Sequence, residues 1–245
     1  LNENLMISQT EEEKRKKEEL ERAWVADGIA RINDILRSSG DKIEDLTYML
    51  IREIVVYTDS KLGAIYILNN ENPDNVFLEM TAVYAYDRKK HLKKEVLIGE
   101  GLVGRCVKEN ETIYLTDVPG DYISIKSGLG ETNPVSLLIV PLKTGDDTVH
   151  GAVEIASFSF MAPYRIHFIE TVGENIATSI SKMKINLSTK KLLEHTRQQA
   201  EEMITQEEEM RQNMEELRAT QEQSAIREEK LNKEIERLKA LLNSK

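Results

Sequence analysis

The second half of this chain is predicted to form one long helix with a heptad repeat. Neither glycine nor proline occurs after Gly173, so nothing in the remaining sequence interrupts a helix. The repeat, in alternating steps of four and three residues, runs through Thr196, Ala200, Met203, Glu207, Met210, Met214, Leu217, Gln221, Ser224, Glu228, Leu231, Ile235, Leu238 and Leu242. This spacing is typical of the core positions of a coiled coil.

A helix with so narrow an apolar stripe requires a partner. Over this length an isolated helix is only marginally stable in water, because most helical stability comes from packing. The most economical partner is another copy of the same chain, so the sequence predicts a parallel homodimer. The predicted interface residues are Met203, Met210, Met214, Leu217, Leu231, Ile235, Leu238 and Leu242.

The repeat is irregular in two respects. Polar residues occupy four of its positions, namely Glu207, Gln221, Ser224 and Glu228. An earlier apolar series, Ile176, Ile180, Met183 and Leu187, is out of phase with the later one. This pattern indicates either loose packing where the helix leaves a domain or a coiled coil with two arrangements of similar energy, as a signal-conducting helix requires.

The composition places the globular part of the chain in the middle. Only 40% of the residues are hydrophobic and 31% are charged, which favours one modest core plus long solvated helices. We therefore predict an N-terminal helix over residues 1–38, a globular domain over 39–186 and a coiled coil over 187–245. The apolar stripe of the first helix contains Val25, Ile29, Ile32 and Leu36.

The middle segment predicts an α+β domain. A helix over about residues 41–57 is followed by short apolar or alternating runs between turn residues, and a closing helix carries Phe168, Val172, Ile176 and Ile180. The runs are LGAIYIL, VFLEMTAVYAY, TIYLTDV, SLLIVPLKT and TVHGAVEIAS, with a possible sixth at KEVLI. These predict five to six strands of an antiparallel sheet, since long helices occur only at the two ends.

Charge and composition argue against several classes of protein. The formal net charge is −10 and no basic face is evident, so the chain lacks the electrostatic footprint of a nucleic-acid-binding protein. One cysteine excludes an internal disulfide and agrees with a cytoplasmic location. No stretch approaches the ~20 apolar residues of a membrane span, so we expect no membrane contact within this chain. The chain begins with Leu1 rather than Met, which agrees with a fragment of a longer, even membrane-associated, protein as well as with a separate chain.

Residues 99–104 spell GEGLVG, which matches the G-x-G-x-x-G fingerprint of dinucleotide-binding loops. Such a loop requires a following helix that packs on a parallel sheet, but only RCVKENE separates these glycines from the next strand. The glycines therefore indicate a tight turn into a short helix. Cys106 has no histidine near it in sequence, which favours a small buried residue over a nucleophile.

Taken together, IGEGLVGRCVKENETIYLTDVPGDY, SLLIVPL and DDTVHGAVEIAS, followed by a closing helix, resemble the GAF domain family over about Ile43 to Ile185. The resemblance implies an antiparallel sheet with the terminal helices on one face and a ligand pocket on the other. It also implies a sensory or regulatory module that dimerises through its flanking helices. The residues typical of cyclic-nucleotide-binding, bilin-binding and haem-binding members have no counterpart here, so no cofactor is identified.

With cyclic nucleotides, bilin and haem disfavoured, the remaining candidate for a ligand is a small molecule of unknown identity. The polar segment that follows TIYLTDV could roof a pocket or simply be a loop over a filled core. A carboxylate within the apolar run GAVEIAS must reach solvent, a partner or a ligand. The predicted ligand-binding residues are Tyr66, Cys106, Tyr122, Ile125, Ser127, Leu129, Glu154 and Ser157, with no catalytic or metal-binding residue.

The leading hypothesis is a non-enzymatic signalling module in which a ligand or conformational state alters the packing of dimeric helices. Upstream or downstream signalling domains or proteins would then be its partners. One alternative is the sensory fragment of a histidine kinase or receptor whose output domain lies outside this chain. The other is a ligand-free dimeric scaffold that recruits a protein through its coiled coil.

Overall fold

The structure is a computed structural model that describes residues 2–38, 40, 42–85, 88–89, 95–120, 122, 125–127 and 130–243. It divides into two compact units, Leu1–Ile185 and Asn186–Lys245. In chain order the elements are α1 (Asn2–Ser38), α2 (Ile43–Tyr57), β1 (Leu62–Asn69), β2 (Phe77–Ala85), β3 (Arg88–Lys89), β4 (Glu95–Leu97), α3 (Gly101–Glu109), β5 (Ile113–Leu115), β6 (Ile125–Ser127), β7 (Gly130–Thr132), β8 (Ser136–Lys143), β9 (Val149–Ser157) and α4 (Pro163–Asn243).

An antiparallel sheet forms the centre of the first unit. Among the described residues it has seven strands in the order β3-β2-β1-β9-β8-β5, with β4 paired to β2. The predicted α+β class is confirmed, and the five predicted runs and the short sixth correspond to β1, β2, β5, β8, β9 and β4. The strand β3 and the separate β6–β7 pair were not expected from the sequence.

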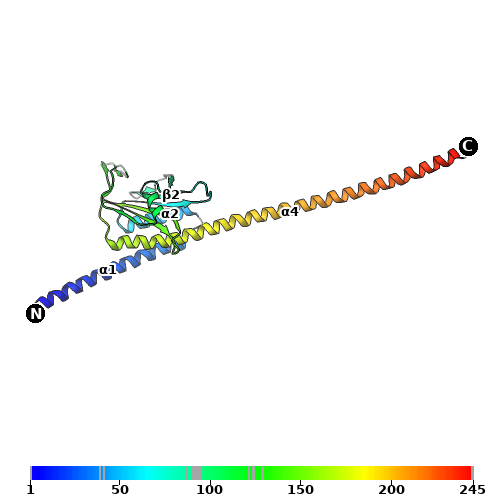
Figure 1. Cartoon of the computed structure of the whole chain (residues 1–245). Helices are drawn as coiled ribbons and strands as arrows, with labels where there is room; N and C mark the ends of the chain where they lie inside the picture. Colours follow the sequence, from blue (N-terminus) through cyan, green and yellow to red (C-terminus); the bar gives the residue numbers. More distant parts are fainter. Residues whose placement is uncertain are drawn as a thin grey trace. The chain divides into compact units, whose positions relative to one another are not determined.

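One face of the sheet is covered by α1, α2 and the first residues of α4 (Figure 1). The predicted apolar positions of α4 within this unit are fully buried: Phe168, Val172, Ile176 and Ile180. They share a core with alternate residues of β9, among them Val153 and Ile155. The helices therefore bury their apolar stripes against a sheet that would otherwise expose that face to water.

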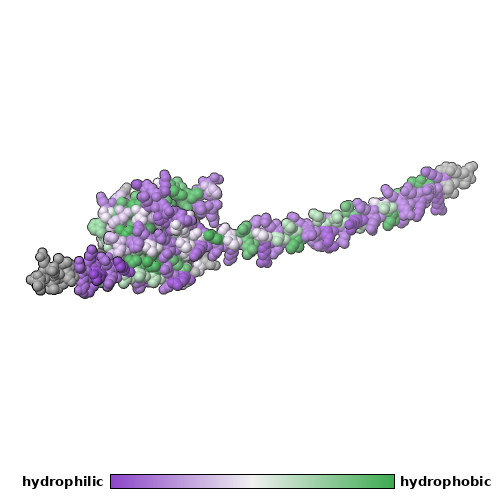
Figure 2. Space-filling view, turned by 60° about the horizontal axis from the view of Figure 1, so that its bottom comes forward, coloured by the Kyte–Doolittle hydropathy of each residue, from purple (hydrophilic) through white to green (hydrophobic). Residues whose placement is uncertain are grey.

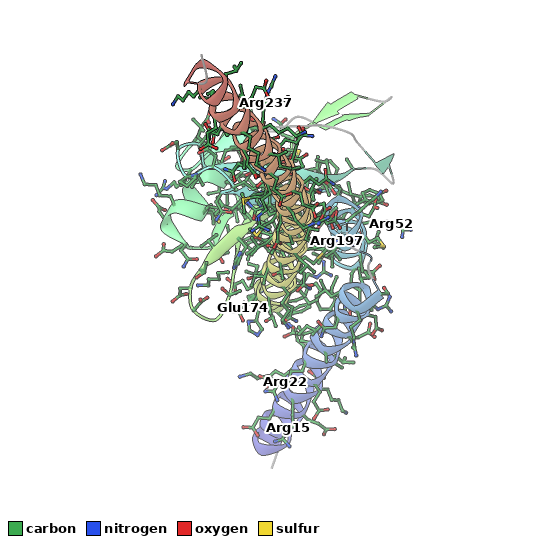
Figure 3. All side chains as sticks on the ribbon, turned by 90° about the vertical axis from the view of Figure 1, so that its right-hand side faces the viewer. Arg15, Arg22, Arg52, Glu174, Arg197 and Arg237 are labelled. Atoms are coloured by element: carbon green, nitrogen blue, oxygen red, sulfur yellow. The ribbon has the colours of Figure 1, made fainter. Side chains whose placement is uncertain are left out.

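Aromatic rings join α1 to this core. The Trp24 ring stacks on Tyr57 at 4.5 Å between centroids and meets Phe168 edge-on at 5.2 Å. The Tyr57 hydroxyl donates to the backbone oxygen of Trp24 over 2.6 Å. These contacts pack part of α1 against the helix-covered core. Figure 3 labels Arg15 and Arg22 on α1, and both side chains are exposed.

A second apolar layer covers the opposite face of the sheet. It consists of α3 together with side chains from β1, β2, β8 and β9 that alternate with those facing the helices. Its fully buried members include Cys106 of α3 and Leu137 and Ile139 of β8. Because both faces are covered, β8 is buried along nearly its whole length, which explains its continuous apolar sequence SLLIVPL.

In the second unit, every side chain described between residues 186 and 239 is exposed. Apolar residues recur among charged ones along this part of α4 (Figure 2). Among the described residues, no helix combines the length and the apolar character needed to cross a lipid bilayer.

Phe168 offers a test of the helix-covered core. Replacing this fully buried ring (Phe168→Ala) removes its contacts with Trp24 and Tyr57, so we expect the free energy of unfolding to fall by roughly 3–5 kcal/mol. The matched control is Phe160→Ala, because Phe160 is 65% exposed and its loss should cost less than about 0.5 kcal/mol. Urea denaturation followed by circular dichroism measures both, and equal losses would contradict this packing.

Candidate functional site

The strand β9 directs one carboxylate into the apolar layer beneath α3. Its side chains alternate, so Val153 and Ile155 face the helices while Ala152 and Ala156 face the other layer. Glu154 lies between these two alanines and is only 3% exposed. A carboxylate in such a position needs hydrogen-bond donors, because water cannot supply them.

The first donor comes from the neighbouring strand. Ala64 of β1 is the register partner of Glu154, and Tyr66 stands two residues further along the same face. The Tyr66 hydroxyl donates to Oε2 of Glu154 over 2.9 Å, and Tyr66 is itself buried. The small side chain of Ala64 leaves room for this diagonal contact. Burial, followed by the charge of Glu154, raises the pKa of Tyr66 well above its ordinary value, so the phenol stays protonated as a donor.

A second donor comes from the segment that follows β5. Tyr122 is half-buried, packs against the same apolar layer and forms a side-chain hydrogen bond with Glu154. Burial, then the charge of Glu154 and lastly the nearby Cys106 raise the pKa of Tyr122 far above its ordinary value. Tyr66, Cys106, Tyr122 and Glu154 therefore form one group, which we name the Glu154 cluster. A strand, a helix, a loop and a second strand each contribute one member.

The thiol of Cys106 is buried and protonated. Its Sγ atom lies 3.7 Å from the backbone oxygen of Ile139, which accepts a weak hydrogen bond, and the residue is 0% exposed. Burial, with a smaller contribution from the charge of Glu109, raises the pKa of Cys106 to about 12. Nucleophilic cysteines need the thiolate form and access to solvent, and Cys106 has neither at neutral pH.

The glycine fingerprint forms a closed turn that leads into α3. The amide of Gly99 donates to the oxygen of Gly104 over 2.9 Å, and the amide of Gly104 donates to Glu100 over 3.1 Å. A Cβ atom on Gly104 would lie 2.3 Å from the oxygen of Leu97, so a larger residue does not fit. Gly99 and Gly101 both have positive φ angles. Because these amides bond within the turn, they are not oriented to cradle a phosphate.

Among the other predicted ligand-binding residues, Ser157 has a described side chain, and it does not join the cluster. Ser157 lies on β9 at the alternate phase to Glu154, and its Oγ atom accepts a hydrogen bond from the amide of Ser159. Ile125 and Ser127 belong to β6, whose backbone pairs with β7. Leu129 lies outside the described residues. The structure thus brings together four of the eight residues named from the sequence.

The structure also contains a surface groove that the sequence did not predict. A groove of about 410 Å³ is lined by residues from the end of α3, from β8 and from the start of α4, including Asn110, Lys143, His167 and Glu174 (Figure 3 labels Glu174). Thr112 donates to Glu170 across it over 2.8 Å. No sequence motif links these residues, because they meet only through folding. Among the described residues, no group of three or more histidine, cysteine or acidic side chains is arranged to hold a metal ion.

Comparison with known families identifies the family to which the middle of the chain is similar. A family model described as GAF domain matches residues 42–181. This range begins just before α2, ends within α4 and contains every member of the Glu154 cluster. A search of curated proteins finds none that matches the chain.

Solved structures share the fold at low sequence identity. The GAF domain of an Acinetobacter phosphoenolpyruvate-protein phosphotransferase is 18% identical, with a TM-score of 0.51 over 65% of this chain and 94% of its own. A putative GAF sensor protein from Burkholderia vietnamiensis is 13% identical, with a TM-score of 0.52 over 68% and 94%. A free methionine-R-sulfoxide reductase from Neisseria meningitidis, solved with its substrate, is 10% identical, with a TM-score of 0.52 over 66% and 91%.

The Cys106 environment predicts low thiol reactivity. With its pKa raised to about 12, Cys106 should react with iodoacetamide at pH 8 on the order of a thousandfold more slowly in the folded protein than in urea. Mass spectrometry of the time course measures both rates. A folded protein that reacts as fast as the unfolded one would show that the thiol is accessible and ionised.

Proposed function

The chain belongs to the GAF domain family, and on this basis we propose that it is a sensory module that binds a small molecule without transforming it. The Glu154 cluster is the proposed binding site. The observation that carries this proposal is a carboxylate buried in an apolar layer and held by two phenols, one of which comes from a loop. Polar side chains buried at positions where an apolar residue would fill the core are typical of binding sites.

The chemistry of the cluster indicates the class of ligand. Glu154 accepts hydrogen bonds, so its complement is a ligand that carries a donor, and a nitrogen with positive charge is the strongest such donor. Tyr66 is held in strand β1, whereas the side chain of the half-buried Tyr122 can move away from Glu154. We therefore propose a small ammonium- or amidinium-bearing ligand that replaces the Tyr122 hydroxyl and remains bonded to Glu154.

The cysteine argues against thiol-based catalysis. Reduction of a substrate by protein thiols needs an accessible thiolate and, for turnover, a partner thiol. The chain has a single cysteine, and that residue is buried with a raised pKa. Although a sulfoxide reductase shares the fold, we therefore propose a non-enzymatic role for this chain.

The output of the module is proposed to pass through α4. This helix begins at Pro163, its first turns pack on the sheet, and the same helix carries the heptad repeat to Asn243. We propose that ligand state shifts the packing of α4 within a dimer held by the terminal helices. Signalling domains or proteins before or after this chain, as in a histidine kinase or receptor, would receive the signal.

One observation favours a different role. Tyr66 and Tyr122 already supply two donors to Glu154, so the interior is stable without a ligand. Under this second proposal the globular unit is a ligand-free dimeric scaffold, and the coiled coil recruits a protein. In either case we propose a cytoplasmic location, because a lone unpaired cysteine suits a reducing compartment.

A thermal-shift experiment separates the two proposals. Ethanolamine and the free amino acids serve as ammonium-bearing probes, and ethylene glycol serves as the neutral counterpart of ethanolamine. A probe at 100 times its dissociation constant stabilises the fold by about 2.7 kcal/mol, which raises Tm by several degrees. The first proposal predicts such a rise for an ammonium-bearing probe, whereas the scaffold predicts none for any probe.

Variants of the cluster locate the binding. Glu154→Gln keeps the shape of the side chain but removes its charge, so it should abolish the rise in Tm. Ser157→Ala is the matched control, because Ser157 lies on the same strand at the opposite phase. If a probe stabilises Glu154→Gln as strongly as the parent, the ligand binds elsewhere.

A further inference from the structure

Lys184 joins α4 to the end of strand β1 where the buried part of the helix ends. It lies one turn beyond Ile180, which is fully buried, and one residue before Ile185, the last residue of the globular unit. Its Nζ atom donates a hydrogen bond to the backbone oxygen of Leu68. We name this hydrogen bond the Lys184 contact. The side chains described from residue 185 to 239 are all exposed, so the contact lies at the boundary between packed and solvated helix.

The Leu68 oxygen lies where the ladder between β1 and β9 ends. The register of these two strands ends with Ile67 opposite Gly151, one residue before Leu68. On its other side, Leu68 still pairs with Leu78 of β2. A backbone oxygen at the end of a ladder needs a donor other than a neighbouring strand. The ammonium of Lys184 supplies that donor from α4.

The ammonium of Lys184 is partly withdrawn from water. Its side chain is half-buried, and burial lowers the pKa of Lys184 while the charge of Glu71 opposes that shift. On β9, burial and then the charge of Lys184 lower the pKa of His150. The flexible stem of a lysine lets its ammonium exchange a protein oxygen for water. The contact can therefore be either formed or broken while the rest of α4 stays packed.

Leu68 also belongs to the apolar layer that holds the Glu154 cluster. Its side chain packs against the layer that contains Tyr66 and Cys106, whereas its backbone oxygen accepts from α4. Tyr66 lies two residues earlier on the same face of β1, and its hydroxyl donates to Glu154 over 2.9 Å. One short stretch of strand therefore contacts both the proposed binding site and the helix proposed to carry the output.

The backbone of β1 is tightly packed on one side of Tyr66 and irregular on the other. A Cβ atom on Gly151 of β9 would lie 2.0 Å from the Tyr66 oxygen, so the two strands approach as closely as only glycine allows. Toward β2 the register shifts between Ile65 and Tyr66. Such irregularities are common beside binding sites, where they set the direction of a side chain. Because β9 blocks movement on its side, we expect a change at Tyr66 to move the end of β1 relative to β2.

From these observations we propose that the Lys184 contact couples the Glu154 cluster to α4. While Glu154 holds Tyr66, the Leu68 oxygen lies within reach of Lys184. When the cluster changes, the contact breaks and the last packed turn of α4 loosens. Lys184 is thus a positioning residue that acts through β1. This inference rests on the proposed function, in which α4 carries the output, and it names the residue through which the site acts on that helix.

Amide hydrogen exchange in the full chain tests the contact. Lys184→Met keeps an apolar stem and a similar helix propensity but removes the donor. The α4 amides of residues 181–185 should then exchange on the order of tenfold faster, because a hydrogen bond from a charged group is lost. Lys184→Arg retains a charged donor and should keep the parent rates. Mass spectrometry of the time course measures these rates.

Lys182→Met is the matched control for this experiment. Lys182 is exposed and lies two residues earlier in the same helix, so its loss should change the same rates less than about twofold. Parent rates in Lys184→Met, or equally faster exchange in Lys182→Met, would overturn the Lys184 contact.

A double-mutant cycle tests the coupling. Tyr66→Phe keeps the ring but removes the hydroxyl that donates to Glu154, so it should also speed exchange at residues 181–185. In the Lys184→Met background the contact is already lost, so Tyr66→Phe should add no further increase. An equal increase in both backgrounds, or no increase in either, would overturn the coupling.

Tyr114→Phe is the matched control for the cycle. It also removes one phenol hydroxyl, which accepts from the amide of Met161 over 2.8 Å, but Tyr114 lies on β5 and not on β1. It should leave exchange at residues 181–185 unchanged, and a rise equal to that of Tyr66→Phe would also overturn the coupling. Neither experiment contains a ligand, so the coupling can fail while ligand binding at the Glu154 cluster stands, and the reverse.

Discussion

Burial of both faces of the central strands is the constraint on which the rest of the structure depends. β1, β9 and β8 each have a strand on either side, and their alternating side chains enter two separate apolar layers. A sheet of this kind requires cover on both faces. The helices α1, α2 and the start of α4 cover one face, and α3 with its flanking segments covers the other.

This constraint also produces the site. Glu154 on β9 is buried away from water, so the hydrogen bond from Tyr66 and the nearby Tyr122 help to offset the cost of burying its carboxylate. The same strand presents Val153 and Ile155 to the core that contains Phe168 of α4. A change in the Glu154 cluster therefore acts on a strand that also contacts the helix proposed to carry the signal. Packed strands shift as units, which gives the proposal its physical basis.

The fold was largely predictable from local patterns, and the site only in part. The spacing of the apolar residues and the turn-forming residues between them identified the helices and the longer strands, because both signals are local in sequence. β3 and the β6–β7 pair were missed, since strands of two or three residues carry no usable period. Tyr66, Tyr122 and Glu154 were named from the sequence as separate candidates. Ser157 was named with them, although its phase on β9 is opposite to that of Glu154.

The sequence by itself determined the family, the class of fold, the long helix and its heptad repeat, because each depends on composition or spacing along the chain. It also indicated that GEGLVG is a turn, since too few residues follow for a crossover helix. Only the tertiary structure decided which amides close that turn, which side of the sheet each residue faces and that Tyr66, Tyr122 and Glu154 meet. Strand register and loop placement set these contacts, and residues 88 apart come within hydrogen-bond distance only when the chain is folded.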